Sequence, residues 1–159
     1  MQKRRTKVFL ISLIGTLIAG SFTYATVKPS ISTMIFWSDV ILVGKVLDVD
    51  NPGGSDRHIK IQVKDFLKAN QVIRGINHLS LSYHRIGVKG DIDFQKLKEE
   101  KTDHIFFIRY VPDGDDSKEP TSFHLELADA WFGVERNDKT LVKKIMEFEQ
   151  RVTTIYEEK

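Results

Sequence analysis

The 159-residue chain contains no cysteine. This absence excludes disulfides, a lipid-modified cysteine anchor, a thiol nucleophile and a cysteine zinc site. The sequence also lacks Gly-x-Ser-x-Gly, Ser-x-x-Lys and any phosphate-binding glycine loop, which are common motifs of nucleophilic catalysis and nucleotide binding. We therefore expect a fold that rests on its hydrophobic core alone, and no sequence feature predicts an enzyme.

The first 25 residues combine a cationic start with a short apolar run. Four cations come first: Lys3, Arg4, Arg5 and Lys7. The uncharged run from Val8 to Gly20 would span roughly 20 Å as a helix, which is less than the ~30 Å hydrocarbon core of a bilayer. Thr23-Tyr24-Ala25 offers a cleavage site. Residues 1–25 are therefore predicted to be a signal peptide, or a membrane anchor through residues 8–25 if they remain uncleaved.

Both versions of the N-terminus predict export, because positive charges before an apolar segment stay in the cytoplasm. The remainder would be secreted, periplasmic or anchored on the outer side of the cytoplasmic membrane. Four of the 24 Lys and Arg residues and none of the 22 Asp and Glu residues fall in the first 25 positions, so the remainder carries a net charge of −2. That balance gives no support to nucleic-acid binding, which requires a clustered basic face.

The rest of the chain is dominated by strand patterns. Residues 40–49 and 105–111 are apolar on both faces, which is typical of strands covered on two sides. Further strands are predicted at 57–64, 76–84, 123–127 and 131–135, the last sending Trp131 and Phe132 to opposite faces. Five or six short strands joined by loops predict a β-rich α+β domain built on a small barrel or sandwich.

Helical patterns occupy the two ends and one insertion. A linker and a short helix, capped by Ser30 or Ser32, are predicted within residues 26–37, before a single domain at 38–159. Residues 93–101 predict a polar helix, and residues 137–139 form either a hairpin turn or a helix cap. The C-terminal stripe marks an amphipathic helix: Leu141, Ile145, Phe148, Val152 and Ile155. We expect this helix to cover strands 40–43 and 105–108 from outside; the alternative is an exposed stripe that recruits a partner.

The run Ser38-Asp39-Val40-Ile41-Leu42-Val43-Gly44-Lys45-Val46 resembles the opening strand of secreted bacterial domains similar to tissue inhibitors of metalloproteinases. Residues 63–67, Lys68, the Gly75 turn and residues 103–110 follow in the corresponding order. The resemblance implies the netrin-like branch of the OB-fold, hence an OB-like antiparallel barrel. The family's cysteines are all missing, including the N-terminal one that chelates the zinc of the target, so the resemblance implies a fold rather than that inhibitory mechanism.

Eight polar residues of the strands at 57–64 and 76–84 point away from the predicted core, and we call them the polar face: His58, Lys60, Gln62, Lys64, His78, Ser80, Ser82 and His84. OB-like barrels commonly bind ligands on this strand pair and its flanking loops. The polar face is therefore the predicted ligand-binding surface. It lacks aromatic side chains on which bases could stack, which argues against single-stranded nucleic acid.

A metal site on the same face is the chemical alternative. Antiparallel pairing of the two strands is predicted to set Lys60 near His84, with His58 diagonally close. Together with Asp56 from the neighbouring loop, His58 and His84 would offer ligands for a hydrolytic metal ion. We expect instead that the imidazoles lie on a solvated strand face, and we predict no metal and no cofactor.

The function predicted from the sequence is that of an exported, non-enzymatic binding module. Its partner would be a protein or an anionic polymer of the cell envelope or the extracellular space. The alternatives are a peptidase-inhibitor-like protein and a metal-dependent hydrolase. Two acidic loops, at 48–56 and 112–120, either bind calcium or form solvated turns; neither has the EF-hand order of ligands.

Overall fold

The computed structural model describes residues 27–53, 56–84, 91–113 and 122–157. The predicted signal at residues 1–25 lies outside the described residues. In the described part of the chain, no helix is both long enough and apolar enough to cross a membrane.

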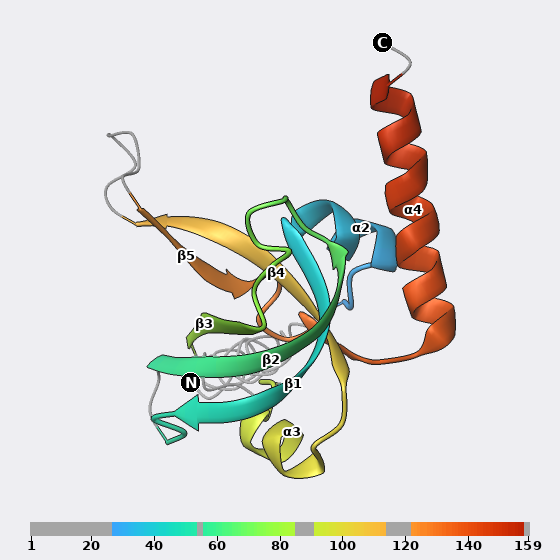
Figure 1. Ribbon diagram of the computed structural model, residues 1–159. Helices are drawn as coiled ribbons and strands as arrows, with labels where there is room; N and C mark the ends of the chain where they lie inside the picture. Colours follow the sequence, from blue (N-terminus) through green and yellow to red (C-terminus); the bar gives the residue numbers. More distant parts are fainter. Residues whose placement is uncertain (1–26, 54–55, 85–90, 114–121, 158–159) are drawn as a thin grey trace, which may run out of the picture.

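Three helices and six strands follow one another along the described chain (Figure 1). In order, they are α2 (Ile31–Trp37), β1 (Val40–Asp50), β2 (Asp56–Lys68), β3 (His78–His84), α3 (Phe94–Glu100), β4 (His104–Asp113), β5 (Ser122–Leu127), β6 (Val134–Arg136) and α4 (Lys139–Glu157).

Five of the strands close into a small OB-like barrel, as predicted. The strand order is β1-β2-β3-β5-β4, and pairing of β1 with β4 closes the ring, while β6 adds to β4 from outside the ring. All these pairings are antiparallel except one, the single parallel pair Ser82–Glu126 between β3 and β5. The sheet is therefore mixed, whereas the sequence prediction was antiparallel throughout.

Gly44 is the last residue of β1 that pairs with both β2 and β4. It is opposite Val63 of β2 on one side and His104 of β4 on the other. A Cβ atom at this position would lie 2.5 Å from the Gln62 carbonyl oxygen and 2.9 Å from a methyl group of Ile61. Only glycine allows the neighbouring backbone to approach this closely.

The predicted strand at 131–135 is wrong in its first half. Trp131 and Phe132 lie in a turn, where their backbone N–H groups donate to Asp129 Oδ1 at 2.8 and 2.9 Å. Strand β6 begins only at Val134. An aspartate side chain that bonds the backbone two and three residues on favours a turn over a ladder, so the side-chain alternation assumed for these two aromatics does not apply.

Two hydrophobic clusters lie on either side of the barrel wall. The inner cluster fills the barrel and includes Leu42, Ile59, Leu81 and Phe106. The outer cluster lies between the wall and the helices: Met34, Ile35, Ile41, Val43, Ile105, Phe107, Ala128 and Ile145. Strands β1 and β4 contribute alternate residues to both clusters, which explains why their sequences are apolar on both faces.

The first half of the C-terminal helix packs on the barrel, as predicted, where Ile145 joins the outer cluster of β1 and β4, and α2 packs beside it (Figure 1). Its buried residue is Ile145, which is 0% exposed, whereas Phe148 is only half-buried. Residues 137–139 form a helix start rather than a hairpin, because Asp138 Oδ1 accepts from the N–H groups of Thr140 and Leu141 at 2.8 and 3.1 Å. These hydrogen bonds hold the pKa of Asp138 below its usual range.

The polar helix α3 closes one end of the barrel. Its first residue, Phe94, is 0% exposed and meets Tyr83 edge-to-face with ring centroids 4.9 Å apart. The Tyr83 hydroxyl donates to the Ala130 carbonyl and accepts from the Ile92 N–H. Asp93 caps the helix by accepting from the Lys96 N–H at 3.1 Å. Phe94, together with the half-buried Leu97, thus connects a largely polar helix to the inner cluster.

Candidate functional site

The polar face exists as a continuous surface on β2 and β3. Alternation buries Ile59, Ile61, Leu79 and Leu81, and it turns the intervening polar residues outward. The facing pairs are His58–Ser82, Lys60–Ser80 and Gln62–His78, with Asp56 opposite His84 at the strand ends. Ser82 is half-buried, and the other members of the polar face are exposed.

The strand register differs from the one predicted. Lys60 lies opposite Ser80 rather than near His84. The cause is the β2–β3 connection at residues 69–77, where Asn70 Oδ1 accepts from the N–H of Ile73 and the Ile73 side chain is buried. With this turn, the chain between Lys60 and its partner is four residues shorter than the predicted register requires, and β3 begins at His78 instead of residue 76.

Strand β1 brings carboxylates to the border of the polar face. The sequence suggests that Asp48 and Asp50 could approach His58 and His84 from the neighbouring loop, but both lie on strand β1. The register shifts between Val46 and Asp48, so Asp48 lies opposite Lys60 and Asp50 opposite His58. The Lys98 ammonium donates to Asp48 Oδ1 at 2.7 Å, and this hydrogen bond lowers the pKa of Asp48. A β-bulge is the physical cause of the shift. The only sign of this register shift in the sequence is that Asp48 and Asp50 stand just before a turn rich in glycine and proline.

Lys64 belongs to the polar face in sequence but is engaged elsewhere. Its ammonium donates to Asp103 Oδ2 at 2.6 Å, just before β4, and this hydrogen bond raises the pKa of Lys64. The Lys64 side chain therefore points toward the N-terminal end of β4 rather than toward His78 or Ser80.

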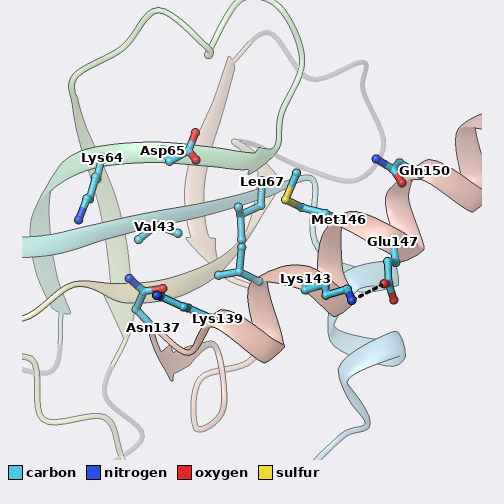
Figure 2. A pocket seen from close by; sticks show the side chains of 11 residues that line it. Val43, Lys64, Asp65, Leu67, Asn137, Lys139, Lys143, Met146, Glu147 and Gln150 are labelled. Atoms are coloured by element: carbon cyan, nitrogen blue, oxygen red, sulfur yellow. Dashed lines mark ion pairs between the residues drawn. The ribbon is translucent and has the colours of Figure 1, made fainter.

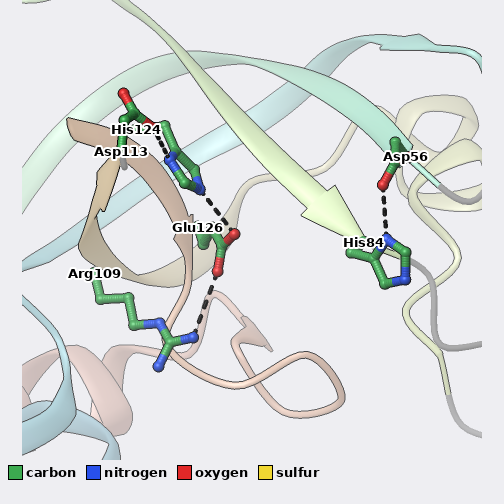
Figure 3. A network of polar contacts seen from close by, with 6 residues as sticks. All are labelled: Asp56, His84, Arg109, Asp113, His124 and Glu126. Carbon is green, nitrogen blue, oxygen red and sulfur yellow. Dashed lines mark hydrogen bonds and ion pairs between the residues drawn. The ribbon is translucent and has the colours of Figure 1, made fainter. Parts of the chain in front are cut away.

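The three candidate metal ligands do not converge. His84 Nδ1 and Asp56 Oδ1 form a hydrogen bond of 2.6 Å (Figure 3), while His58 lies between Asp50 and Ser82 in the ladder. Among the described residues, no three His, Asp or Glu side chains are grouped to hold a metal ion. Much of the acidic loop at 112–120 lies outside the described residues, so the calcium alternative there remains a prediction.

A second polar cluster lies on the β4–β5 hairpin, and the sequence reasoning did not find it. His124 Nδ1 lies 2.5 Å from Asp113 Oδ1 and its Nε2 lies 2.9 Å from Glu126 Oε1 (Figure 3). Arg109 approaches the other oxygen of Glu126 at 3.4 Å, and Ser122 donates to Asp113. Only the pairing of β4 with β5 brings these residues together, because they are separated by a loop in the sequence.

This cluster favours a charged imidazole. The hydrogen bonds to Glu126 and then to Asp113 raise the pKa of His124, and bonds from Ser122 and His124 lower the pKa of Asp113. An imidazole that donates from both nitrogens has no lone pair left to act as a base. The arrangement therefore favours the charged imidazole between the two carboxylates and holds the two strands of the hairpin together.

Replacing His124 with glutamine is expected to destabilise the protein in a pH-dependent way. A raised histidine pKa contributes stability below its unfolded value, and a lowered aspartate pKa contributes stability above its unfolded value. The loss should therefore be larger at about pH 5.5 than at about pH 9. Melting temperatures of both proteins at the two pH values test this, with His78→Gln on β3 as the control; an equal loss at both pH values would contradict the charged cluster.

A groove runs between α4 and the second half of β2 (Figure 2). Its volume is about 590 Å³, and apolar parts of Val43, Leu67, Val142 and Met146 form its floor. Charged side chains of both signs surround it: Lys64, Asp65, Lys139, Lys143 and Glu147, with Lys143 and Glu147 paired at 3.7 Å. The groove thus has a mixed rim and presents no convergent set of reactive groups.

Comparisons with known proteins add no relative. No protein-family model matches the chain, and no curated protein sequence matches it.

Proposed function

We propose that the chain is an exported, non-enzymatic interaction module whose polar face binds a protein partner outside the cytoplasm. The cationic and apolar N-terminus supports export. The OB-like barrel supports binding on β2 and β3, because this fold commonly uses that strand pair for ligands. The resemblance to netrin-like secreted domains points in the same direction.

The observation that carries the proposal is the charge pattern across β1, β2 and β3. Carboxylates of Asp48, Asp50 and Asp56 alternate with Lys60, His58 and His84 in facing positions. Asp48 is bound by Lys98 and Asp56 by His84. An anionic polymer gains little from a face on which the basic side chains already lie against carboxylates, whereas a protein surface can offer both charges in a matching order. Of the two partner classes that the sequence left open, the charge pattern therefore favours the protein.

Site-specific photo-crosslinking in the native host tests this proposal. A photoreactive residue at Ser80, opposite Lys60, is expected to capture a protein, whereas one at Lys143 on α4 is not. Lys60→Glu should reduce the Ser80 crosslink about fivefold or more, because it places a fourth carboxylate on the face. The matched control Lys143→Glu should leave the crosslink unchanged.

Two results would contradict the proposal. Capture of an anionic polymer instead of a protein at Ser80, with the capture lost on addition of excess soluble polyglutamate, would indicate an anionic-polymer ligand. Recovery of the protein from the cytoplasm with Met1 still at its N-terminus, as read by N-terminal sequencing, would refute export.

A further inference from the structure

Helix α2 exposes two aromatic side chains. Its inner side, with Met34 and Ile35 each 1% exposed, belongs to the outer cluster beneath α4. On its outer side Phe36 is 79% exposed and Trp37 is 48% exposed. The other outward residues are small hydroxyl residues, an exposed Ser32 and a half-buried Thr33.

Helix α2 itself carries no charge next to these aromatics. Other elements do bring charges to its sides: Lys144, Glu147 and Arg151 of α4 line a groove with Ser32, and the Lys68 ammonium donates to the Ile35 carbonyl oxygen. None of the ten residues from Pro29 to Ser38 is charged. The nearest charges before and after them in the sequence are engaged with other elements: Lys28 pairs with Glu135 of β6, and Asp39 accepts from the Tyr110 N–H at 2.8 Å. A surface helix in water normally presents charged or strongly polar residues on its outer face. An uncharged face that ends in Phe and Trp is instead typical of the membrane–water interface.

The chain before α2 supplies the reason why this face would meet lipid. The apolar run that ends at Gly20 is separated from Ile31 by ten residues, which span at most about 35 Å when fully extended. A membrane that holds the apolar run would therefore lie within reach of α2. By contrast, the two aromatic rings of each copy bury at most about 500 Å², so a pair of copies would bury at most about 1,000 Å² through them, which is below the ~1,200 Å² of a stable protein interface. A second copy of the chain is thus the weaker occupant.

We propose that Phe36 and Trp37 insert into the interfacial region of a lipid bilayer, so that the outer side of α2 lies on the membrane surface. The rigid packing of Met34 and Ile35 against the barrel then fixes how the domain stands relative to the membrane. The inference rests on the proposed export for the choice of the outer leaflet, and on an uncleaved N-terminus for the nearness of the membrane. Lipid contact by α2 is independent of what the polar face binds.

Because the chain has no cysteine, an introduced cysteine can carry a thiol-reactive label at one chosen position. Full-length chain carrying Phe36→Cys is labelled with an environment-sensitive fluorophore and incorporated into phosphatidylcholine–phosphatidylglycerol vesicles that contain doxyl-labelled lipid. Phe123→Cys on β5 is the matched control, because Phe123 is also an exposed phenylalanine, at 57%. Quenching by the doxyl lipid is expected to be at least about twofold stronger at position 36 than at position 123.

Intrinsic fluorescence gives a second measurement that needs no label at Phe36. The chain has two tryptophans, so Trp131→Phe reports on Trp37 alone and Trp37→Phe reports on Trp131 alone. Trp37 should be quenched by the doxyl lipid and protected from acrylamide only when vesicles are present, whereas Trp131 should not change.

Equal quenching at positions 36 and 123 would overturn the lipid contact, as would protection of Trp37 in the absence of lipid. Protection without lipid, together with crosslinking between copies, would identify a second copy as the occupant. Either result leaves the Ser80 crosslink unaffected, so failure of this inference is distinguishable from failure of the proposed function.

Discussion

Phe94→Ala is expected to lower the free energy of unfolding by about 3–5 kcal/mol. Phe94 is fully buried and is the residue through which α3 closes the barrel against Tyr83. Its removal leaves a cavity beside Tyr83, whose hydroxyl also holds the backbone of Ala130 and Ile92. Chemical denaturation followed by circular dichroism measures the change.

The control for this prediction is Phe123→Ala. It deletes the same side chain from a position that is 57% exposed, so its effect should stay within about 0.5 kcal/mol. Equal losses for the two variants would show that α3 does not close the barrel end. A large loss only for Phe94→Ala would establish α3 as part of the domain core despite its polar composition.

Ile145→Ala is expected to cost about 2–5 kcal/mol, because it removes the fully buried side chain of α4 from the outer cluster. The higher helix propensity of alanine offsets only a few tenths of a kcal/mol of this loss. Thermal and chemical unfolding at low protein concentration provide the measurement. An unchanged midpoint would mean that α4 does not cover the barrel.

Two neighbours on α4 calibrate the Ile145 result. Met146 is 48% exposed, so Met146→Ala should have little effect. Phe148 is half-buried, so Phe148→Ala should fall between the other two. The sequence analysis points to Phe148 as the residue whose truncation would cost the most stability, provided that its side chain is fully buried. The structure meets that condition at Ile145, one turn earlier in the helix.

Sequence patterns predicted the positions of most elements because each pattern has a local cause. Alternating residues define β2 and β3, double-sided apolar runs define β1 and β4, and the stripe at spacings of three and four defines α4. Ser30, predicted as one of two possible caps, accepts from the Thr33 N–H and begins α2. Strand β6 was the weakest prediction, because the side chain of Asp129 competes for the backbone there.

The geometry of the polar face could be predicted only in part. Alternation determines which side chains point outward. A shift of the strand pairing by two residues leaves the same side chains outward, so alternation does not determine the register. The actual register, with Lys60 opposite Ser80, depends on how residues 69–77 fold around Asn70 and Ile73. The residues were therefore correctly grouped except for Lys64, which reaches Asp103, but their cross-strand partners were not correctly predicted.

By itself, the sequence determined the absence of disulfides, the charge balance after residue 25, the uncharged stretch before Asp39 and which residues of each strand face the core. Only the tertiary structure decided that Asp48 and Asp50 border the polar face, that Asp113 and Glu126 enclose His124, and that Phe94 closes the barrel. The physical reason is that each of these contacts joins residues through a bulge, a strand pairing or a barrel end. Such features depend on how whole elements pack, whereas periodicity describes only one element at a time.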